Sequence, residues 1–567
     1  MRYVRTAPAL LLVIAIALTI AYFASPASAE TITVTREDDP SPDGCTNNGC
    51  TFREAADLGN TTAGNQIIDI GDKEIVLTSG ITLTGDMTIM GVDDVTSIIR
   101  INPGAQIFNI SAVANVTFTK VWIYGATAGG PGNCGGAIYN AGELNLTHMK
   151  VAKNFITGKG AGLCNVGTAT LDDVNMSANS ASGNTGGAIF NSGTMTILNS
   201  TITQNQAIEG AGISNDAAGT MTIEHSHILD NTADTNLCSD CASGGGIATS
   251  GTLTLEDSTV ADNTADNGAG LVSRGTTTIR RSTFSGNQAG AINNSDGTMT
   301  IVRSTISNNI GKSGSTAGIA GISNNSTLSL INSTIADNPA SGFQYGGLFT
   351  NTTASSSYKA TIFSNNGPNN CHTGGNQSSL GYNVYAPMTN ACETTGPGDQ
   401  EVADAMIGAL ANNGGPTMTR LPQVGSVAIN TGGPGCPTPD QLGSLLVGGC
   451  DAGAAEYGGV PITATASPTV APPADSYPMG DVGCSDSVTI EDLVPALKLV
   501  TKLAPPDRCG REALPCFNFE NACYPPWVDT NCDNQMTGVD VVRIAAHLAG
   551  APILDGCPNV GEYIPHN

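Results

Sequence analysis

The stretch GGAIFNSGTMTILNSTITQN, from Gly186 to Asn205, decides the fold, because close relatives of it recur along the chain. Each relative opens on small residues followed by an aliphatic residue, as in GGAIYN (Gly135–Asn140), GAGLCN (Gly160–Asn165) and GAGISN (Gly210–Asn215). The relatives follow one another at intervals of about 25 residues, and self-similarity at a period of this length indicates a solenoid.

Within each repeat, apolar and polar residues alternate with the period of a β-strand. In the quoted stretch Met195 and Ile197 fall on one side, and Thr194 and Thr196 fall on the other. We therefore predict about three strands per repeat and a right-handed parallel β-helix over residues 65–384, with about eleven or twelve coils. Met195, Ile197 and Ile202 should lie inside, and the two threonines should lie outside.

An asparagine ends a strand in nearly every repeat. Asparagine accepts the left-handed backbone of a tight corner, and its amides can hydrogen-bond from coil to coil as a ladder. The predicted corner residues are Asn154, Asn179, Asn205, Asn231, Asn263, Asn287, Asn309, Asn338 and Asn365.

Composition and the N-terminus place the chain outside the cytoplasm. Residues 1–29 carry two arginines, an apolar run and an Ala-Ser-Ala triplet, which is the pattern of a secretory signal with cleavage after Ala29. The 16 cysteines of an exported chain are expected to form disulfides. We expect an extracellular protein, secreted or attached to the cell surface, without a transmembrane span after signal cleavage. The net charge of −26 argues against nucleic acid as a partner.

The segment 30–64 contains Cys50-Thr51-Phe52-Arg53-Glu54-Ala55, preceded by Cys45. It resembles the Cys-Ser-Leu-Arg-Glu-Ala motif that opens many secreted bacterial β-helix proteins, with Thr and Phe in place of Ser and Leu. The resemblance implies an N-terminal cap. We expect a short helix with an Arg53–Glu54 pair that covers the first coil, rather than a catalytic pair.

The segment 385–459 carries LANNGGPT (Leu410–Thr417), SVAI (Ser426–Ile429) and DAGAAE (Asp451–Glu456). It is similar to the choice-of-anchor segment that follows β-helices in surface proteins, with Val427 inserted in the middle motif. This resemblance implies a β-helix closing region, in which we expect Cys436 and Cys450 to form a disulfide.

A linker rich in Pro, Thr and Ala (residues 460–478) leads to a final domain, residues 479–567. In its loop Asp529–Asp540, the residues Asp529, Asn531, Asp533 and Asp540 occupy positions 1, 3, 5 and 12, and the Gln535 carbonyl occupies position 7. These are the oxygen-ligand positions of a calcium loop. A helical pattern follows, and a similar loop–helix stretch begins at Asp481.

This duplicated loop–helix resembles the dockerin domain, which implies a small α-helical module, Ca²⁺ as cofactor and a cohesin-like receptor as partner. The first loop departs from the pattern, since Gly483 stands at position 3 and has no side-chain ligand. We expect weak calcium binding there, through Asp481, Ser485, Ser487 and Asp492.

No catalytic residue is predicted. The predicted solenoid resembles pectate lyases and polygalacturonases (the pectin-lyase-like fold), but fold alone does not imply their activity. Asp93-Asp94 and Asp172-Asp173 are present, without the Gly-His-Gly and Arg-x-Lys of galacturonan hydrolases. The strongest catalytic candidate is a set of charges that we expect on one outer face: Arg274, Arg280, Arg281, Arg303, Glu256 and Asp257. A metal site is the less favoured interpretation of Glu224, His225, His227, Cys238 and Cys241.

Three functions therefore stay open. The first is a non-catalytic rod that binds a glycan or a surface and docks through its last domain. The second is a polysaccharide lyase or glycoside hydrolase, and the third is a structural spacer.

Overall fold

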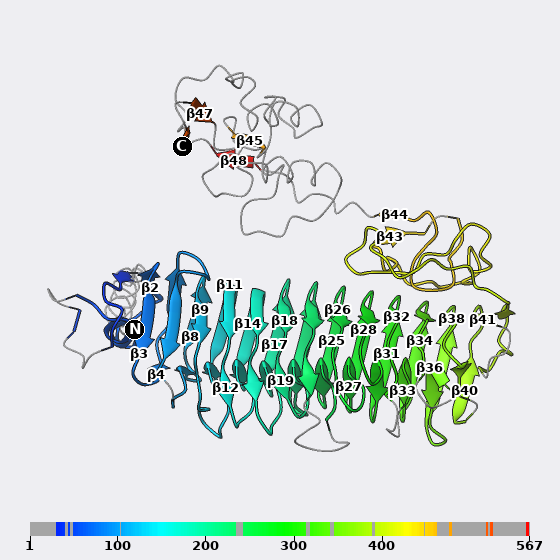
Figure 1. Ribbon diagram of the computed structural model, residues 1–567, viewed down its shortest axis with the longest axis horizontal. Helices are drawn as coiled ribbons and strands as arrows, with labels where there is room; N and C mark the ends of the chain where they lie inside the picture. Colours follow the sequence, from blue (N-terminus) through cyan, green and yellow to red (C-terminus); the bar gives the residue numbers. More distant parts are fainter. Residues whose placement is uncertain are drawn as a thin grey trace, which may run out of the picture. The chain divides into compact units, whose positions relative to one another are not determined.

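The computed structural model describes residues 30–461, with gaps at 40–43, 46–48, 103, 234–241, 313–317, 341–344, 373, 388–391 and 447, and four short strands beyond. The chain forms two compact units, residues 1–462 and 463–567. The first unit is a solenoid of parallel strands stacked coil over coil (Figure 1). The predicted parallel β-helix is thus confirmed, and its right-handedness stays a prediction.

The strands of the solenoid stack in three walls. The third wall is a sheet of 12 parallel strands, which matches the number of coils expected from the repeats. Its strands are β4 (Ile81–Leu83), β7 (Phe108–Ile110), β10 (Ile138–Asn140), β13 (Leu163–Asn165), β16 (Ile189–Asn191), β20 (Ile213–Asn215), β24 (Ile247–Thr249), β27 (Leu271–Ser273), β30 (Ile292–Asn294), β33 (Ile322–Asn324), β36 (Tyr345–Thr350) and β39 (Asn369–Cys371).

The first wall carries the alternating threonine stretches. Its strands are β1 (Thr31–Thr33), β2 (Gln66–Gly71), β5 (Met87–Gly91), β8 (Asn115–Thr119), β11 (Glu143–Ala152), β14 (Thr168–Ser177), β17 (Thr194–Leu198), β21 (Thr220–Glu224), β25 (Thr252–Glu256), β28 (Thr276–Arg280), β31 (Thr298–Val302), β34 (Thr327–Ile331), β37 (Ser355–Lys359) and β40 (Asn376–Ser379).

The second wall follows the first after a corner, and the long strands β11 and β14 run through both walls. Its other strands are β3 (Glu74–Leu77), β6 (Ile98–Ile101), β9 (Trp122–Tyr124), β18 (Thr201–Thr203), β22 (His227–Leu229), β26 (Thr259–Ala261), β29 (Thr283–Ser285), β32 (Thr305–Ser307), β35 (Thr334–Ala336), β38 (Ile362–Ser364), β41 (Val384–Ala386) and β42 (Gln400–Glu401). The short strands β12 (Phe155–Ile156), β15 (Ser180–Ala181), β19 (Gln206–Ala207) and β23 (Thr232–Ala233) form a separate small sheet.

The predicted strand register is confirmed in β17 and β18. Met195, Ile197 and Ile202 are at most 1% exposed, whereas Thr194 is exposed and Thr196 is half-buried. The β17 strand pairs in parallel with β14 and β21, so that Ile197 lies between Leu171 and Ile223 of the neighbouring coils. The core is therefore a stack of aliphatic side chains repeated once per coil.

Of the paired glycines that open a repeat, Gly187 lies against the next coil, where an added Cβ would meet the carbonyl oxygen of Ala211 at 2.3 Å, and Gly186 makes a tight turn within its own coil. Gly186 has a φ of +69°, and a Cβ added there would lie 2.3 Å from the carbonyl oxygen of Ile189. Both the backbone conformation and the close approach require glycine at this position.

The asparagine ladder is present, and its last member differs from the one predicted. The Nδ2 of Asn154 donates to Oδ1 of Asn179 at 2.9 Å, and the same bond recurs from coil to coil. The series runs on through Asn205, Asn231, Asn263, Asn287, Asn309 and Asn338 to Asn366 and Asn370. Asn366, not Asn365, therefore occupies the ladder.

The left-handed corner belongs to the residue before each ladder asparagine from Asn154 to Asn366, which corrects the predicted conformation. Gln204 precedes Asn205 with a φ of +57°, and Asn365 precedes Asn366 with a φ of +54°. The ladder asparagine itself turns inward and is almost fully buried. Its buried amide is satisfied by its neighbours in the stack and by backbone carbonyls, such as that of Met176 for Asn205.

Helix α2 (Phe52–Thr61) forms the N-terminal cap, and its charges pair differently from the prediction. Thr51 and Glu54 make a capping box at the helix start, while Arg53 donates to both carboxylate oxygens of Asp39 at 2.7 and 2.6 Å. The expected Arg53–Glu54 pair is therefore wrong. Phe52 is 1% exposed and packs edge-on against Phe108 of β7, so that the helix covers the first coils.

After β42 the chain no longer adds coils. Residues 402–459, which we name the closing segment, instead run along the outside of the second wall (Figure 1). The segment ends in a short antiparallel pair, β43 (Ser444–Leu445) with β44 (Val460–Pro461). The expected disulfide Cys436–Cys450 lies within it, and three further described disulfides are Cys45–Cys50, Cys134–Cys164 and Cys371–Cys392.

In the second unit the structure describes two antiparallel strand pairs. These are β45 (Ser476–Pro478) with β48 (Tyr563–Pro565), and β46 (Phe517–Phe519) with β47 (Ala522–Tyr524). Among the residues that the structure describes, none of the helices has the length and apolar character needed to span a membrane.

Candidate functional site

Two aromatic side chains project from the second wall. Strand β9 alternates like its neighbours, so that Ile123 is buried and Trp122 and Tyr124 both face outward. Their ring centroids are 4.7 Å apart with the planes tilted by 35°. The chain is only 5% aromatic and has two tryptophans, and a second outward pair, Tyr345 and Phe349, lies on β36 of the third wall.

Positively charged side chains surround this pair. Lys150 of β11 stands in register with Trp122, and its Nζ lies 4.9 Å from the ring centroid. The Nζ of Lys153 lies 5.4 Å from the same ring. Both distances fall within the range of a cation–π contact.

Two more cations complete the group. Arg100 of β6 stands in register with Tyr124, and Lys120 occupies the corner that precedes β9, with a φ of +56°. We name the whole group the cation–aromatic patch: Arg100, Lys120, Trp122, Tyr124, Lys150 and Lys153.

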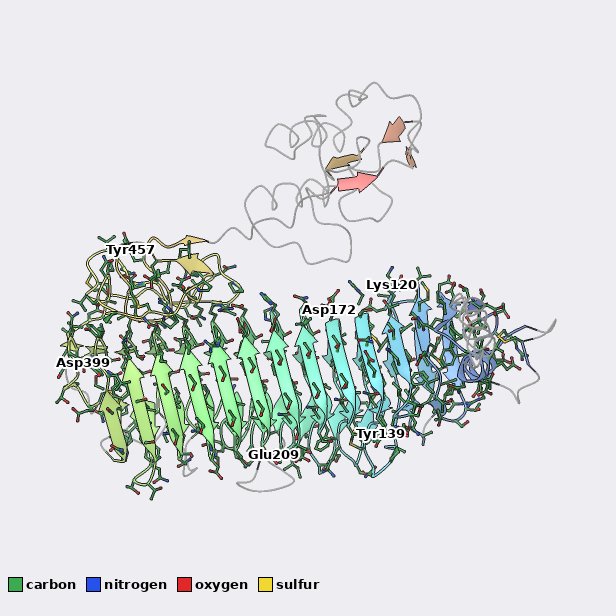
Figure 2. The ribbon with its side chains drawn as sticks, turned by 180° about the vertical axis from the view of Figure 1, so that it is seen from behind. Lys120, Tyr139, Asp172, Glu209, Asp399 and Tyr457 are labelled. Atoms are coloured by element: carbon green, nitrogen blue, oxygen red, sulfur yellow. A yellow bond between two sulfur atoms is a disulfide. The ribbon has the colours of Figure 1, made fainter. Side chains whose placement is uncertain are left out.

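The second wall is open at the patch and covered farther along. The outward threonines of β18, Thr201 and Thr203, are half-buried, whereas Thr283 and Thr305 are 0% exposed beneath the closing segment. Figure 2 shows Tyr457 of this segment on the same long side of the solenoid as Lys120. The open part of the wall therefore ends at the edge of the closing segment.

The closing segment is attached to the second wall by polar contacts. Gln441 donates to Thr283 Oγ1 at 2.8 Å and accepts from Thr305 Oγ1 at 2.6 Å. The Ala454 amide donates to Thr334 Oγ1 at 3.1 Å. Arg420 forms an ion pair with Asp337 at the corner after β35. These residues belong to coils that lie far apart in sequence from the closing segment.

A buried ion cluster lies at the centre of this attachment. Arg303, only 1% exposed, forms an ion pair with Glu456 at 2.8 Å and donates to the carbonyl oxygens of Pro437 and Gly453. Asp440 and Asp451 are also buried and accept backbone amide hydrogen bonds. Burial raises the pKa of Asp440, Asp451 and Glu456, and the charge of Arg303 partly offsets this rise.

The arginines predicted to gather on one face are separated into three settings, which corrects that prediction. Arg274 pairs with Glu209, and Arg281 pairs with Glu256 and Asp257 at the corner between the first and second walls. Arg303 lies beneath the closing segment. Arg280 is exposed and stands in register with Glu256. Each of the three paired arginines already has a carboxylate partner, so the set does not form one catalytic centre.

The two histidines of the less favoured metal site lie at a corner and on the strand that follows it. His225 occupies a corner with a φ of +48° and faces the Asp257 carboxylate at 3.8 Å. His227 lies on the next strand, β22, with its side chain exposed. Glu224 ends β21, and Cys238 and Cys241 lie outside the described residues. The structure thus gives no support to a metal site at these residues.

The acidic pairs of the sequence are held in loops and corners. Asp93 accepts hydrogen bonds from the amides of Val95 and Thr96, which lower its pKa. Asp172 accepts from Asn199 at 2.8 Å, and Asp173 faces His148 across the corner at 3.9 Å. These contacts account for both pairs as structural charges.

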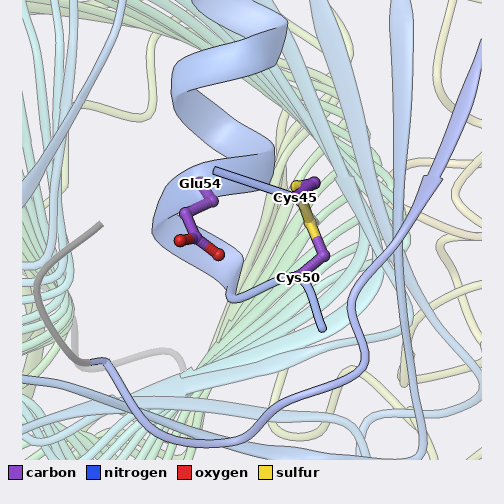
Figure 3. A group of neighbouring side chains, drawn as sticks. All are labelled: Cys45, Cys50 and Glu54. Atoms are coloured by element: carbon purple, nitrogen blue, oxygen red, sulfur yellow. A yellow bond between two sulfur atoms is a disulfide. The ribbon is translucent and has the colours of Figure 1, made fainter. Parts of the chain in front are cut away.

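Within the described part of the chain, one group of metal-ligating residue types comes together, and its ligands are already engaged. It consists of Cys45, Cys50 and Glu54 (Figure 3). The two sulfur atoms form a disulfide, and Glu54 accepts from the Thr51 amide at 2.8 Å. This group therefore belongs to the cap. The predicted calcium ligands, in the loops at 481–492 and 529–540, lie outside the described residues.

Sequence reasoning missed the cation–aromatic patch. The signal was present in VWIYG (Val121–Gly125), where two aromatic residues alternate with aliphatic ones. This segment precedes the clear repeats, and its flanking cations come from coils about 25 residues away in either direction.

Comparison with known proteins adds little to this description. No family model matches the chain, and no curated protein matches its sequence. Among solved structures, the crystal structure of pectate lyase Pel9A aligns with 76% of this chain and 96% of that chain, at 13% identity and a TM-score of 0.37. A likeness at this level carries no argument, so the assignment of a parallel β-solenoid rests on the strand pairing of the chain itself.

Proposed function

We propose that the protein is an extracellular or cell-surface rod that binds a glycan without cleaving it. The observation that carries the proposal is the outward pair Trp122–Tyr124 on the open part of the second wall. Aromatic rings offer a flat apolar surface with a polar edge, which suits the carbon-bound hydrogens and hydroxyl groups of a sugar ring.

The repeats suit this role. Successive strands along the wall lie about 4.8 Å apart, so a polymer lying along the solenoid would meet a similar backbone at each coil. The outward residues near the patch are short and polar on β14 and β18, where Asn175, Ser177, Thr201 and Thr203 are all half-buried. Such side chains can donate to and accept from sugar hydroxyls.

The alternative function, cleavage of a polysaccharide, has weaker support. The best catalytic candidates from the sequence, Arg281 and Arg303, are engaged in ion pairs with carboxylates. Purely structural spacing would need no outward aromatic pair, and the spacer hypothesis therefore leaves the patch unexplained.

Residues 479–567 complete the proposal as a docking module. The support is the spacing of the oxygen ligands Asp529, Asn531, Asp533 and Asp540 in the sequence, which fits Ca²⁺. We propose that this module holds the rod to a cohesin-like receptor.

The proposal is tested by binding the full-length protein to a panel of immobilised acidic and neutral polysaccharides. We expect retention on at least one polysaccharide, without release of unsaturated or reducing ends from it. Tyr124→Ala should weaken binding by about tenfold, a loss of ~1.4 kcal/mol. Tyr457→Ala removes a tyrosine that is 41% exposed and lies outside the patch, and it should leave binding unchanged. Failure to bind any polysaccharide, or release of new chain ends, would contradict the proposal.

A further inference from the structure

The charge around Trp122 and Tyr124 differs in sign from that of the whole protein. The chain carries a net charge of −26, yet the patch brings together Arg100, Lys120, Lys150 and Lys153. In β3, β6 and β9, and in the parts of β11 and β14 that belong to this wall, Glu74 is the acidic residue, and it pairs with Arg100. The corner row that holds Lys120 also carries Asp173, which faces His148. The local surface therefore has an excess of positive charge.

The described contacts within the protein do not neutralise this positive charge. Lys150 and Lys153 lie over the Trp122 ring, and no described carboxylate forms an ion pair with either lysine. Their ammonium groups therefore stand next to the aromatic pair. An anionic substituent there would gain both charge attraction and a charge-assisted hydrogen bond.

The row that contains Lys150 also includes two buried polar atoms. Trp122, Lys150 and Asn175 stand in register on β9, β11 and β14. In the described part of the chain, Trp122 Nε1 and Asn175 Oδ1 are buried atoms without a hydrogen-bond partner. Both atoms are closed to the outer surface, so a ligand on the wall does not reach them, and the argument for a ligand rests on the exposed charges.

We infer that the glycan bound at the cation–aromatic patch is an acidic polysaccharide, whose carboxylate or sulfate groups lie against Lys150 and Lys153. This inference rests on the proposed function and specifies its ligand class. The sugar ring packs against the Trp122–Tyr124 pair beside these two lysines. The closing segment leaves this part of the wall uncovered, so that a polymer lying along the solenoid reaches all three strands.

The test compares polymers that differ in charge, using the full-length protein. The probes are polygalacturonate, a sulfated galactan and an uncharged galactan, with binding measured by calorimetry. The acidic polymers should bind at least about tenfold more tightly than the uncharged one, and added salt should weaken this preference by screening. The two acidic probes show whether carboxylate or sulfate is preferred.

The decisive variant is the double substitution Lys150→Gln with Lys153→Gln. It should reduce the affinity for the acidic polymers by about tenfold or more, and by a clearly larger factor than the affinity for uncharged galactan. Lys159→Gln is the matched control, because Lys159 also lies over an aromatic ring, Phe190 at 4.6 Å, but outside the patch. The control should bind like the parent protein.

The outcomes separate this inference from the proposed function. If uncharged galactan binds as tightly as the acidic polymers and the double variant changes nothing, the acidic ligand class is wrong while glycan binding stands. If no polysaccharide binds, the proposed function itself fails. Tighter binding of single-stranded poly(dT) than of either acidic polymer, lost in the same double variant, would assign the patch to nucleic acid and overturn the inference.

Discussion

Along β17 successive side chains alternate between the outer face and the core, with threonine outside and Met195 or Ile197 inside. Threonine and isoleucine both have branched side chains that suit a strand. Ile197 is 0% exposed, and it stacks between Leu171 and Ile223, whereas Thr196 points outward between Thr170 and Thr222. The consequence of a substitution therefore depends on the side of the strand and hardly on the residue's strand propensity.

Ile197→Asp should destabilise the solenoid by several kcal/mol, roughly 3–5, because it places a charge without a partner in an aliphatic stack. Thr196→Asp should cost about 1 kcal/mol or less, since the carboxylate reaches water. Thermal unfolding of the two variants beside the parent protein measures the difference. Equal loss of melting temperature in both variants would contradict the register.

The ladder shows where residue-level prediction succeeds and where it fails. The recurrence of asparagine at one corner identified the ladder, because stacked amides are the simplest way to satisfy buried polar corners. The sequence SNNG offers two adjacent asparagines, Asn365 and Asn366. Either asparagine can follow a strand. In the structure Asn365 occupies the left-handed corner, and the side chain of Asn366 points inward and joins the ladder.

At the scale of an element, the closing segment brings one positive and three negative groups together in a buried cluster. Arg303 belongs to the corner between β31 and β32, and Asp440, Asp451 and Glu456 come from the closing segment. The raised pKa values mean that the folded protein holds protons which the unfolded chain releases at a lower pH. The stability contributed by these groups is complete below about pH 4 and is lost as the pH rises through the raised folded values.

Glu456→Gln should therefore flatten the dependence of stability on pH. The parent protein should lose melting temperature between mildly acidic and neutral pH through these carboxyls, and the variant should lose less, because its amide does not titrate. Glu401→Gln, at an exposed glutamate of β42, is the matched control and should follow the parent. Parallel curves for parent and Glu456→Gln would show that the pKa of Glu456 is not raised.

The sequence pointed to this segment without revealing its placement. The motif at Asp451–Glu456 stood out by its resemblance to a choice-of-anchor segment, yet the partner of Glu456 is Arg303, which precedes it by about 150 residues. Arg303 had been grouped with Arg274 and Arg281 because all three fall in the repeats. Contacts between residues this distant follow from how the chain turns back after β42, and no local pattern encodes that turn.

At the scale of the whole molecule, the second unit is expected to add a metal-dependent function to the rod. The loop Asp529–Asp540 offers four side-chain oxygen ligands at calcium spacing, whereas the loop Asp481–Asp492 has Gly483 at position 3. Calorimetric titration of the full-length protein with Ca²⁺ under oxidising conditions should detect binding that Asp533→Ala weakens by about tenfold or more. Ser485→Ala should change it little. Unaltered affinity in Asp533→Ala would rule out the second loop as the main site.

The periodic part of the molecule was thus predictable because each coil repeats the same short-range sequence pattern. The cation–aromatic patch was not, since Arg100, Trp122 and Lys150 each look ordinary in their own segment and become a group only when three coils stack. The net charge of the chain did not indicate the patch either, because four local positive residues have little effect on a total of −26.

The placement of the closing segment has a consequence for how the rod comes apart. In a simple solenoid each coil contacts only the coils on either side of it, so unfolding can start at any point and spread. Here one continuous stretch of chain bonds to Thr283, Thr305, Thr334 and the carbonyl of Ala360, which belong to four different coils. Those coils should open together as a single cooperative block, while the coils around β9 keep the independence of an ordinary repeat and fray more readily.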